Sequence, residues 1–161
     1  MFSDRRKQEI KNYLDNVHGK VYIGCDSVVS RRYNKERQRV EYFARYAVVL
    51  IVHIDNRHGC KIFSYTEVEP VYDQSLRSPK LRLMNEVYKS VECFDAMSDI
   101  LSGREVEIHI DVNPSPEHAS NSIVKQAVGY VKGVTSLNPV IKPDAWAGSA
   151  TADCVARGKI A

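Results

Sequence analysis

The chain has 161 residues, of which 43% are hydrophobic and 27% are charged, a balance that excludes intrinsic disorder and predicts one globular domain. No apolar run approaches the length of a transmembrane helix, so we expect no membrane partner. The net charge of +3 is compatible with a polyanionic partner but is too small to identify one.

The first part of the chain predicts one helix followed by three antiparallel strands. Apolar residues recur at helical spacing over residues 4–17, and Gly19 ends that helix. Three runs rich in β-branched and aromatic residues follow, over residues 21–29, 40–54 and 60–68. Residues 30–39 form a basic turn between the first two runs, so the three strands make an antiparallel meander.

The second part of the chain alternates helices with strands. Ser78-Pro79 predicts the start of a helix that continues to about residue 101. We then expect a strand, a helix from 117 or 118, a short strand and an Ala-rich helix, over residues 106–112, 117–133, 138–141 and 146–156. This order predicts a single α/β domain over residues 1–161, with a leading helix in 1–19 and a core in 20–161. Its mixed five-stranded sheet has three antiparallel strands, then two parallel ones, flanked by helices.

Two predicted strands carry the main indication of function, because each is followed by a carboxylate. The segments are Val21-Tyr-Ile-Gly-Cys-Asp26-Ser27 and Val106-Glu-Ile-His-Ile-Asp111-Val-Asn113. Right-handed crossovers place the fourth strand beside the first, so Asp26 and Asp111 meet at one end of the sheet. Two carboxylates held that close repel each other unless a cation lies between them. Glu86 on the long helix and Asp153 on the last helix are expected to converge there too.

Four converging carboxylates indicate metal-assisted phosphodiester chemistry. Mg²⁺ and Mn²⁺ take oxygen ligands, and two ions about 4 Å apart stabilise the attacking and leaving oxygens of a phosphoryl displacement. We therefore expect a nuclease with two metal ions, bridged by Asp26, that hydrolyses RNA, RNA–DNA hybrid or structured DNA. Each position also has an ordinary explanation, since a strand-end Asp often begins a turn and a helical Glu is often only solvated.

Several other side chains are candidates for contact with the substrate: Ser27, Asn113, His118, Lys142, Arg31 and Arg32. Lys142 follows the last short strand, where it can direct an ammonium at a phosphate or simply be solvated. The basic turn can contact a nucleic-acid backbone or be a solvated hairpin tip. His109 is either a partner of the metal site or a satisfied sheet histidine. Gly24 is expected to resist replacement, because bulk on its face would crowd the metal site.

The rest of the sequence excludes other chemistries. The cysteines form no C-x-x-C pair, so we expect free thiols rather than a structural zinc site. There is no Gly-rich phosphate loop, and no Ser, Cys and His arrangement supports covalent catalysis. The N-terminal segment is charged and lacks an apolar region, so we expect a cytoplasmic protein without a signal peptide.

Five blocks in order resemble the RNase H-like family of predicted nucleases typified by the bacterial YkuK proteins. They are Ile23–Ser27, Ile108–Asn113, Gly129–Gly133, Ile141–Ala147 and Ala150–Asp153, and the resemblance runs from about residue 20 to the end. It implies an RNase H-like fold in which Asp26, Asp111 and Asp153 are metal ligands and Glu86 is the helix carboxylate. The family pattern at the first block is Gly-Thr-Asp-Ser-Gln, whereas Cys25 and Val28 replace the Thr and Gln here.

Fold alone does not settle function, so a second hypothesis stays open. In it the chain is a catalytically inactive RNase H-like module that binds nucleic acid or another protein. The choice between RNA and DNA, internal and terminal cleavage, the oligomeric state and the pathway also stay open.

Overall fold

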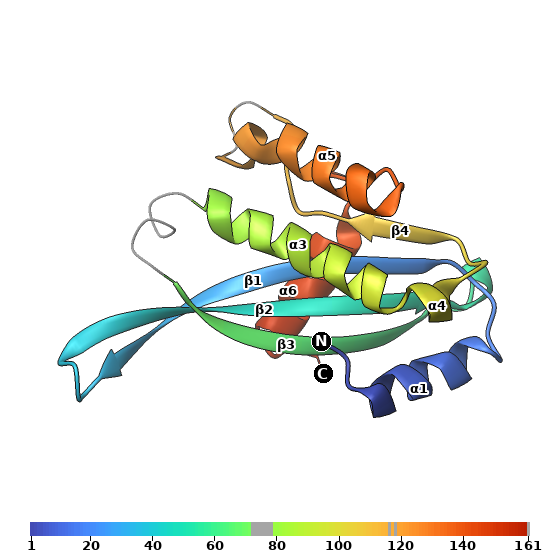
Figure 1. The fold of residues 1–161 in the computed structure, drawn as a ribbon, viewed down its shortest axis with the longest axis horizontal. Helices are drawn as coiled ribbons and strands as arrows, with labels where there is room; N and C mark the ends of the chain where they lie inside the picture. The colour runs from blue at the N-terminus through green and yellow to red at the C-terminus, as the bar shows by residue number, and fades with distance from the viewer. Residues whose placement is uncertain (72–78, 116, 118, 161) are drawn as a thin grey trace.

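The core of the molecule is one mixed sheet with the strand order β3-β2-β1-β4 (Figure 1). The computed structural model describes residues 1–71, 79–115, 117 and 119–160. Antiparallel pairing joins β1 to β2 and β2 to β3, and β4 runs parallel to β1; the strands are Val21–Asn34, Arg39–His53, Cys60–Val71 and Val106–His109. The fourth strand therefore lies beside the first, as the crossover rule predicts.

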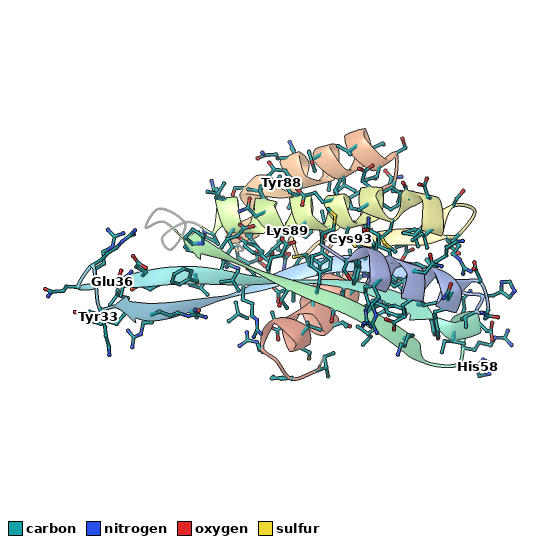
Figure 2. All side chains as sticks on the ribbon, turned by 60° about the horizontal axis from the view of Figure 1, so that its bottom comes forward. Tyr33, Glu36, His58, Tyr88, Lys89 and Cys93 are labelled. Carbon is teal, nitrogen blue, oxygen red and sulfur yellow. The ribbon has the colours of Figure 1, made fainter. Side chains whose placement is uncertain are left out.

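Helices cover both faces of this sheet, so the central strand β2 is buried on both sides. Helices α1 and α3, Asp4–Leu14 and Lys80–Ala96, pack with Ile23, Val48 and Leu50 on one face. The π-helix η3 and helix α6, Ala147–Ala152 and Asp153–Ala156, pack with the alternate side chains of β2, Val49 and Ile51, on the other. Figure 2 shows α3 and α6 on opposite sides of the strands. A strand covered on both faces needs a continuous apolar run, which β2 has.

The remaining helices complete the layer on the α3 side. Helix α4, Ser98–Leu101, follows α3 and leads into β4. The 3₁₀ helix η2 and helix α5, Ala119–Ile123 and Val124–Thr135, follow β4, and α5 packs its Ala127 and Val131 against α3 and the β4 region. Among the described residues no helix is long and apolar enough to cross a membrane.

A buried ion pair docks α3 on the sheet and so sets the position of Glu86, one turn earlier. Lys89 has a side chain that is 9% exposed, and its Nζ lies 2.6 Å from carboxylate oxygens of Glu67 and of Glu69 on β3. The ammonium also lies 5.0 Å from the centroid of the Tyr46 ring on β2. A buried lysine is tolerated only when its charge is compensated in this way.

The prediction of a fifth strand is wrong for the described part of the chain. Only one parallel bridge forms there, between His109 and Val140. Val140 donates to Ile108 O at 2.8 Å and accepts from Ile110 N at 2.9 Å, but the pairing does not grow into a strand. Prolines at 139 and 143 flank this short segment and have no N–H to donate to a ladder.

Several predicted boundaries also differ. The expected helix over residues 146–156 begins as a π-helix, and the expected helix over 117–133 begins as a 3₁₀ turn. The long helix predicted to residue 101 is divided between α3 and α4, and its expected N-cap Ser78 lies outside the described residues. Most of the basic turn over 30–39 is strand instead, because β1 and β2 remain paired out to Asn34 and Arg39.

This extra pairing forms a two-stranded arm, which we define as residues 32–41. The last pair of β2 with β3 is Tyr42 with Val71, whereas β1 and β2 stay paired for three more positions. Figure 1 shows the arm projecting beyond the sheet, and Figure 2 labels Tyr33 and Glu36 near its end. The arm is exposed on both faces, so its side chains contribute little to the core.

The π-helix reaches the sheet at a glycine. A Cβ built on Gly24 would lie 2.6 Å from the backbone nitrogen of Gly148 and 2.8 Å from the carbonyl carbon of Ala147. Backbone atoms cannot move aside as a flexible side chain can, so only glycine fits here. The position is constrained by packing against this backbone, a reason different from the crowding of a metal site that the sequence suggested.

We therefore expect Gly24→Ala to lower the free energy of unfolding by about 2–3 kcal/mol, the usual cost of overpacking. Urea denaturation measures this change. The matched control is Gly129→Ala on α5, where an added Cβ meets nothing within 4 Å and should leave stability equal or slightly higher. A Gly24→Ala protein as stable as the wild type would contradict this close packing.

Candidate active site

Glu86 is a buried carboxylate held by a serine and an arginine. It lies on α3, is 3% exposed, and accepts a hydrogen bond of 2.6 Å from the hydroxyl of Ser27 on β1. Arg82, one turn earlier on α3, donates to the Ser27 hydroxyl at 2.7 Å and to Glu86 at 3.1 Å. Burial raises the pKa of Glu86 to about 8, although the Ser27 hydrogen bond opposes the shift and the charge of Asp26 adds to it.

Asp26 precedes Ser27 on β1 and therefore points to the opposite face of the sheet. Its carboxylate accepts a hydrogen bond of 2.7 Å from the backbone N–H of Ser27. Burial, together with the negative charges of Asp111 and Asp153, raises the pKa of Asp26 to about 6, although the hydrogen bond from Ser27 N–H opposes the shift. The three carboxylates, from β1, from the segment after β4 and from α6, are thus near enough to repel one another.

Asp111 lies two residues beyond β4 and pairs with Lys142. The Nζ of Lys142 is 2.5 Å from Oδ1 of Asp111, and the two side chains are 38% and 16% exposed. This Oδ1 is buried, yet no hydrogen bond of acceptable geometry reaches it. The contact is thus a close ion pair, in which Lys142 compensates the charge of Asp111.

Asp153 is the first residue of α6 and also has a basic partner. Arg157, one turn later, donates from Nε to its Oδ1 at 2.5 Å. Both side chains are partly exposed, at 53% for Arg157 and 26% for Asp153, so the pair adds little to stability. Arg157 and Lys142 each neutralise one of the four carboxylates.

The donor chemistry of these residues fits a hard divalent cation. All four candidate ligands offer carboxylate oxygens, the type that Mg²⁺ and Mn²⁺ prefer. Burial, with the charges of neighbouring carboxylates added, raises the pKa values of Asp26 and Glu86. Nevertheless, within the described ranges no three His, Cys, Asp or Glu side chains form a ready-made metal-binding group.

The predicted substrate contacts lie in different places. Ser27 is buried against Glu86, so it positions a carboxylate instead of facing solvent. Asn113 accepts from the backbone N–H of Ser115 at 3.0 Å in the segment after β4, and His118 lies outside the described residues. Arg31 and Arg32 are exposed neighbours on β1 that point to opposite faces, about 16–20 Å along the strand from Asp26.

His109 is a structural residue, in agreement with the hypothesis of a satisfied sheet histidine. It is 1% exposed, its Nδ1 accepts from Ala147 N at 3.2 Å, and its Nε2 lies 3.2 Å from a carboxylate oxygen of Glu107. Burial lowers the pKa of this ring, so it stays neutral at physiological pH. The hydrogen bond to Ala147 fixes the start of the π-helix on the sheet.

The sequence reasoning missed two basic residues of this site. Arg82 lies four positions before Glu86, and Arg157 lies four positions after Asp153. Opposite charges at this spacing are neighbours on a helix, so the pattern was available as a signal. It was weak because such pairs are common on solvated helix surfaces.

Comparison with known proteins gives one positive result. A family model described as Ribonuclease H-like matches residues 5–157, which is nearly the whole chain. No curated protein and no solved structure matches the chain.

The buried carboxylates predict a pH dependence of stability. The pKa of Glu86 is about 8 in the folded state and about 4.3 in an unfolded chain. At pH values between these two, the folded state therefore binds more protons than the unfolded state. The free energy of unfolding should therefore fall as pH rises from about 6.5 to about 8, by up to about 2 kcal/mol. Urea titrations at several pH values measure this slope.

Glu86→Gln should flatten the slope, because the amide has no proton to lose. Glu92→Gln is the matched control, since Glu92 is exposed on the same helix. Equal slopes in both variants would show that Glu86 is not responsible.

Proposed function

The chain belongs to the ribonuclease H-like family, and from this premise we propose that it is a divalent-metal-dependent nuclease. Its substrates would be phosphodiester bonds in RNA, RNA–DNA hybrid or structured DNA. The observation that carries the proposal is that Asp111 and Asp153 lie close enough to the partly buried Asp26 for their charges to add to the effect of burial on its pKa. Repulsion between neighbouring carboxylates does not stabilise a fold, whereas a cation site is built from carboxylates grouped in this way.

The proposal gives each carboxylate a role in holding two Mg²⁺ or Mn²⁺ ions. In it Asp26, on a central strand of the sheet, would hold the ions together with Asp111, Glu86 and Asp153, all through carboxylate oxygens. Ser27 and Arg82 orient Glu86 through the hydrogen bonds they make to it. When bound, the ions supply an activated water and stabilise the charge on the leaving oxygen.

Lys142 has two alternative partners in this proposal. Without a metal its ammonium compensates Asp111, at 2.5 Å. Metal binding at Asp111 replaces that compensation, so the ammonium becomes available to a phosphate oxygen of the substrate. The partly exposed position of Lys142 allows this exchange, because its side chain is 38% exposed.

The second candidate is a catalytically inactive module that binds nucleic acid or protein. The observation in its favour is that Lys142 and Arg157 already neutralise two of the carboxylates. A site that only compensates charge internally would need no metal. Metal binding therefore separates the two candidates before any cleavage is measured.

We expect isothermal titration with Mn²⁺ to show binding that Asp26→Asn and Asp111→Asn each abolish, with cleavage reduced on the order of a thousandfold. The wild type should cleave at least one member of a panel of RNA, hybrid and branched DNA. Asp99→Asn is the matched control, because Asp99 is an exposed residue of α4 outside the site. A wild type that neither binds Mn²⁺ nor cleaves the panel would leave the inactive module as the better description.

Lys142→Met should separate the two roles of this lysine. Without the ammonium, Asp111 has no competing cation, so Mn²⁺ should bind severalfold more tightly in the titration. The KM for substrate should rise, because a phosphate contact is lost. Lys132→Met on α5 serves as the control, since Lys132 is exposed. Unchanged Mn²⁺ affinity in Lys142→Met would argue against competition at Asp111.

A further inference from the structure

A groove lined by arginines lies at the base of the arm, on the face of the sheet that carries α6. Its volume is about 590 Å³, and three guanidinium groups line it above an apolar floor. We call it the arginine groove, defined by Arg32, Arg45 and Arg157 with Val28, Val68 and Ala156. Among the residues that the structure describes, none that lines the groove is acidic.

The groove starts next to the carboxylate site. Val28 is the next residue after Asp26 on the same face of β1, about 6.6 Å further along, and Arg32 follows two such steps later. Arg45 is the cross-strand partner of Val28, so it shares this face. Arg157 closes the side nearest α6, where it is already paired with Asp153. An extended ligand bound at Asp26 and Asp153 would therefore continue into the groove.

Each guanidinium is anchored by a contact that leaves it accessible. Arg45 donates to the backbone oxygen of Ala156 at 3.4 Å, and the guanidinium carbon of Arg32 lies 5.4 Å from the centroid of the Phe43 ring. All three arginines are exposed, and a guanidinium has five N–H donors. Anchored, exposed arginines are suited to phosphate, because their planar fork binds two phosphate oxygens at once.

We propose that the arginine groove binds the sugar-phosphate backbone of a nucleic-acid strand beside the bond held at the carboxylates. The proposal rests on the proposed function for its choice of nucleic acid over another polyanion. The guanidinium groups contact phosphates, and Val28, Val68 and Ala156 lie under the sugars. Because the contacts are to the backbone, the groove tracks a strand without reading its sequence.

The test measures binding in EDTA, so that it depends on neither metal nor cleavage. Fluorescence anisotropy with a short labelled single-stranded RNA gives the affinity at several salt concentrations. Arg32→Gln combined with Arg45→Gln should weaken binding on the order of tenfold and reduce the salt slope by about 1.4, or about 0.7 for each lost phosphate contact. Arg5→Gln combined with Arg57→Gln is the control, with the same charge change at exposed positions outside the groove.

The double variant removes the hydrogen bond from Arg45 to Ala156, which could change stability by itself. Arg32→Gln alone controls for this, because it leaves that hydrogen bond intact. It should reduce the salt slope by about 0.7 without changing the melting temperature. A groove variant with the affinity and slope of the control overturns the proposal, and so does a wild type that fails to bind the RNA at low salt. Absence of metal-dependent cleavage with these binding results intact would count against the nuclease proposal alone.

Discussion

The parallel pairing of β4 with β1 is the contact on which the site depends. Four residue pairs, from Val21 with Val106 to Gly24 with His109, fix the register of two strands that are far apart in the chain. This register carries the segment after β4 past the middle of β1, which places Asp111 near Asp26. The backbone of the π-helix η3 packs against β1 at Gly24. Helix α6, which begins at Asp153, follows η3 directly. One pairing therefore brings three separate carboxylates to one region.

Bringing those carboxylates together costs folding free energy, because the charges of Asp111 and Asp153 oppose the ionisation of Asp26 and add to the rise of its pKa. The fold compensates the charge with basic residues from the chain itself, and these side chains are partly exposed. Arg82, Lys142 and Arg157 each lie beside one carboxylate, and only Glu86 is deeply buried. Under the proposed function, a divalent cation would compensate this charge more fully than the basic side chains do.

The arginines extend this electrostatic pattern outward along the sheet. Negative charge gathers around Asp26, and positive charge follows on the same face through Arg45 and Arg32. In the arm β1 and β2 pair only with each other as far as the described residues show, so this pairing contributes little to burial. A cation at the carboxylates and a polyanion on the arginines would neutralise both ends.

Local patterns in the sequence were enough to predict most of the helices, four of the five expected strands, the place of the fourth strand beside the first, and the family. Hydrophobic periodicity and turn residues are local signals, and Asp26 and Asp111 stand at recognisable points in those patterns. Only the tertiary structure decided that the segment at Val140 forms a single bridge, that the last helix begins as a π-helix, and that Gly24 is required by the backbone of Gly148. These features depend on distances between segments remote in the chain, and side-chain periodicity carries no information about such distances.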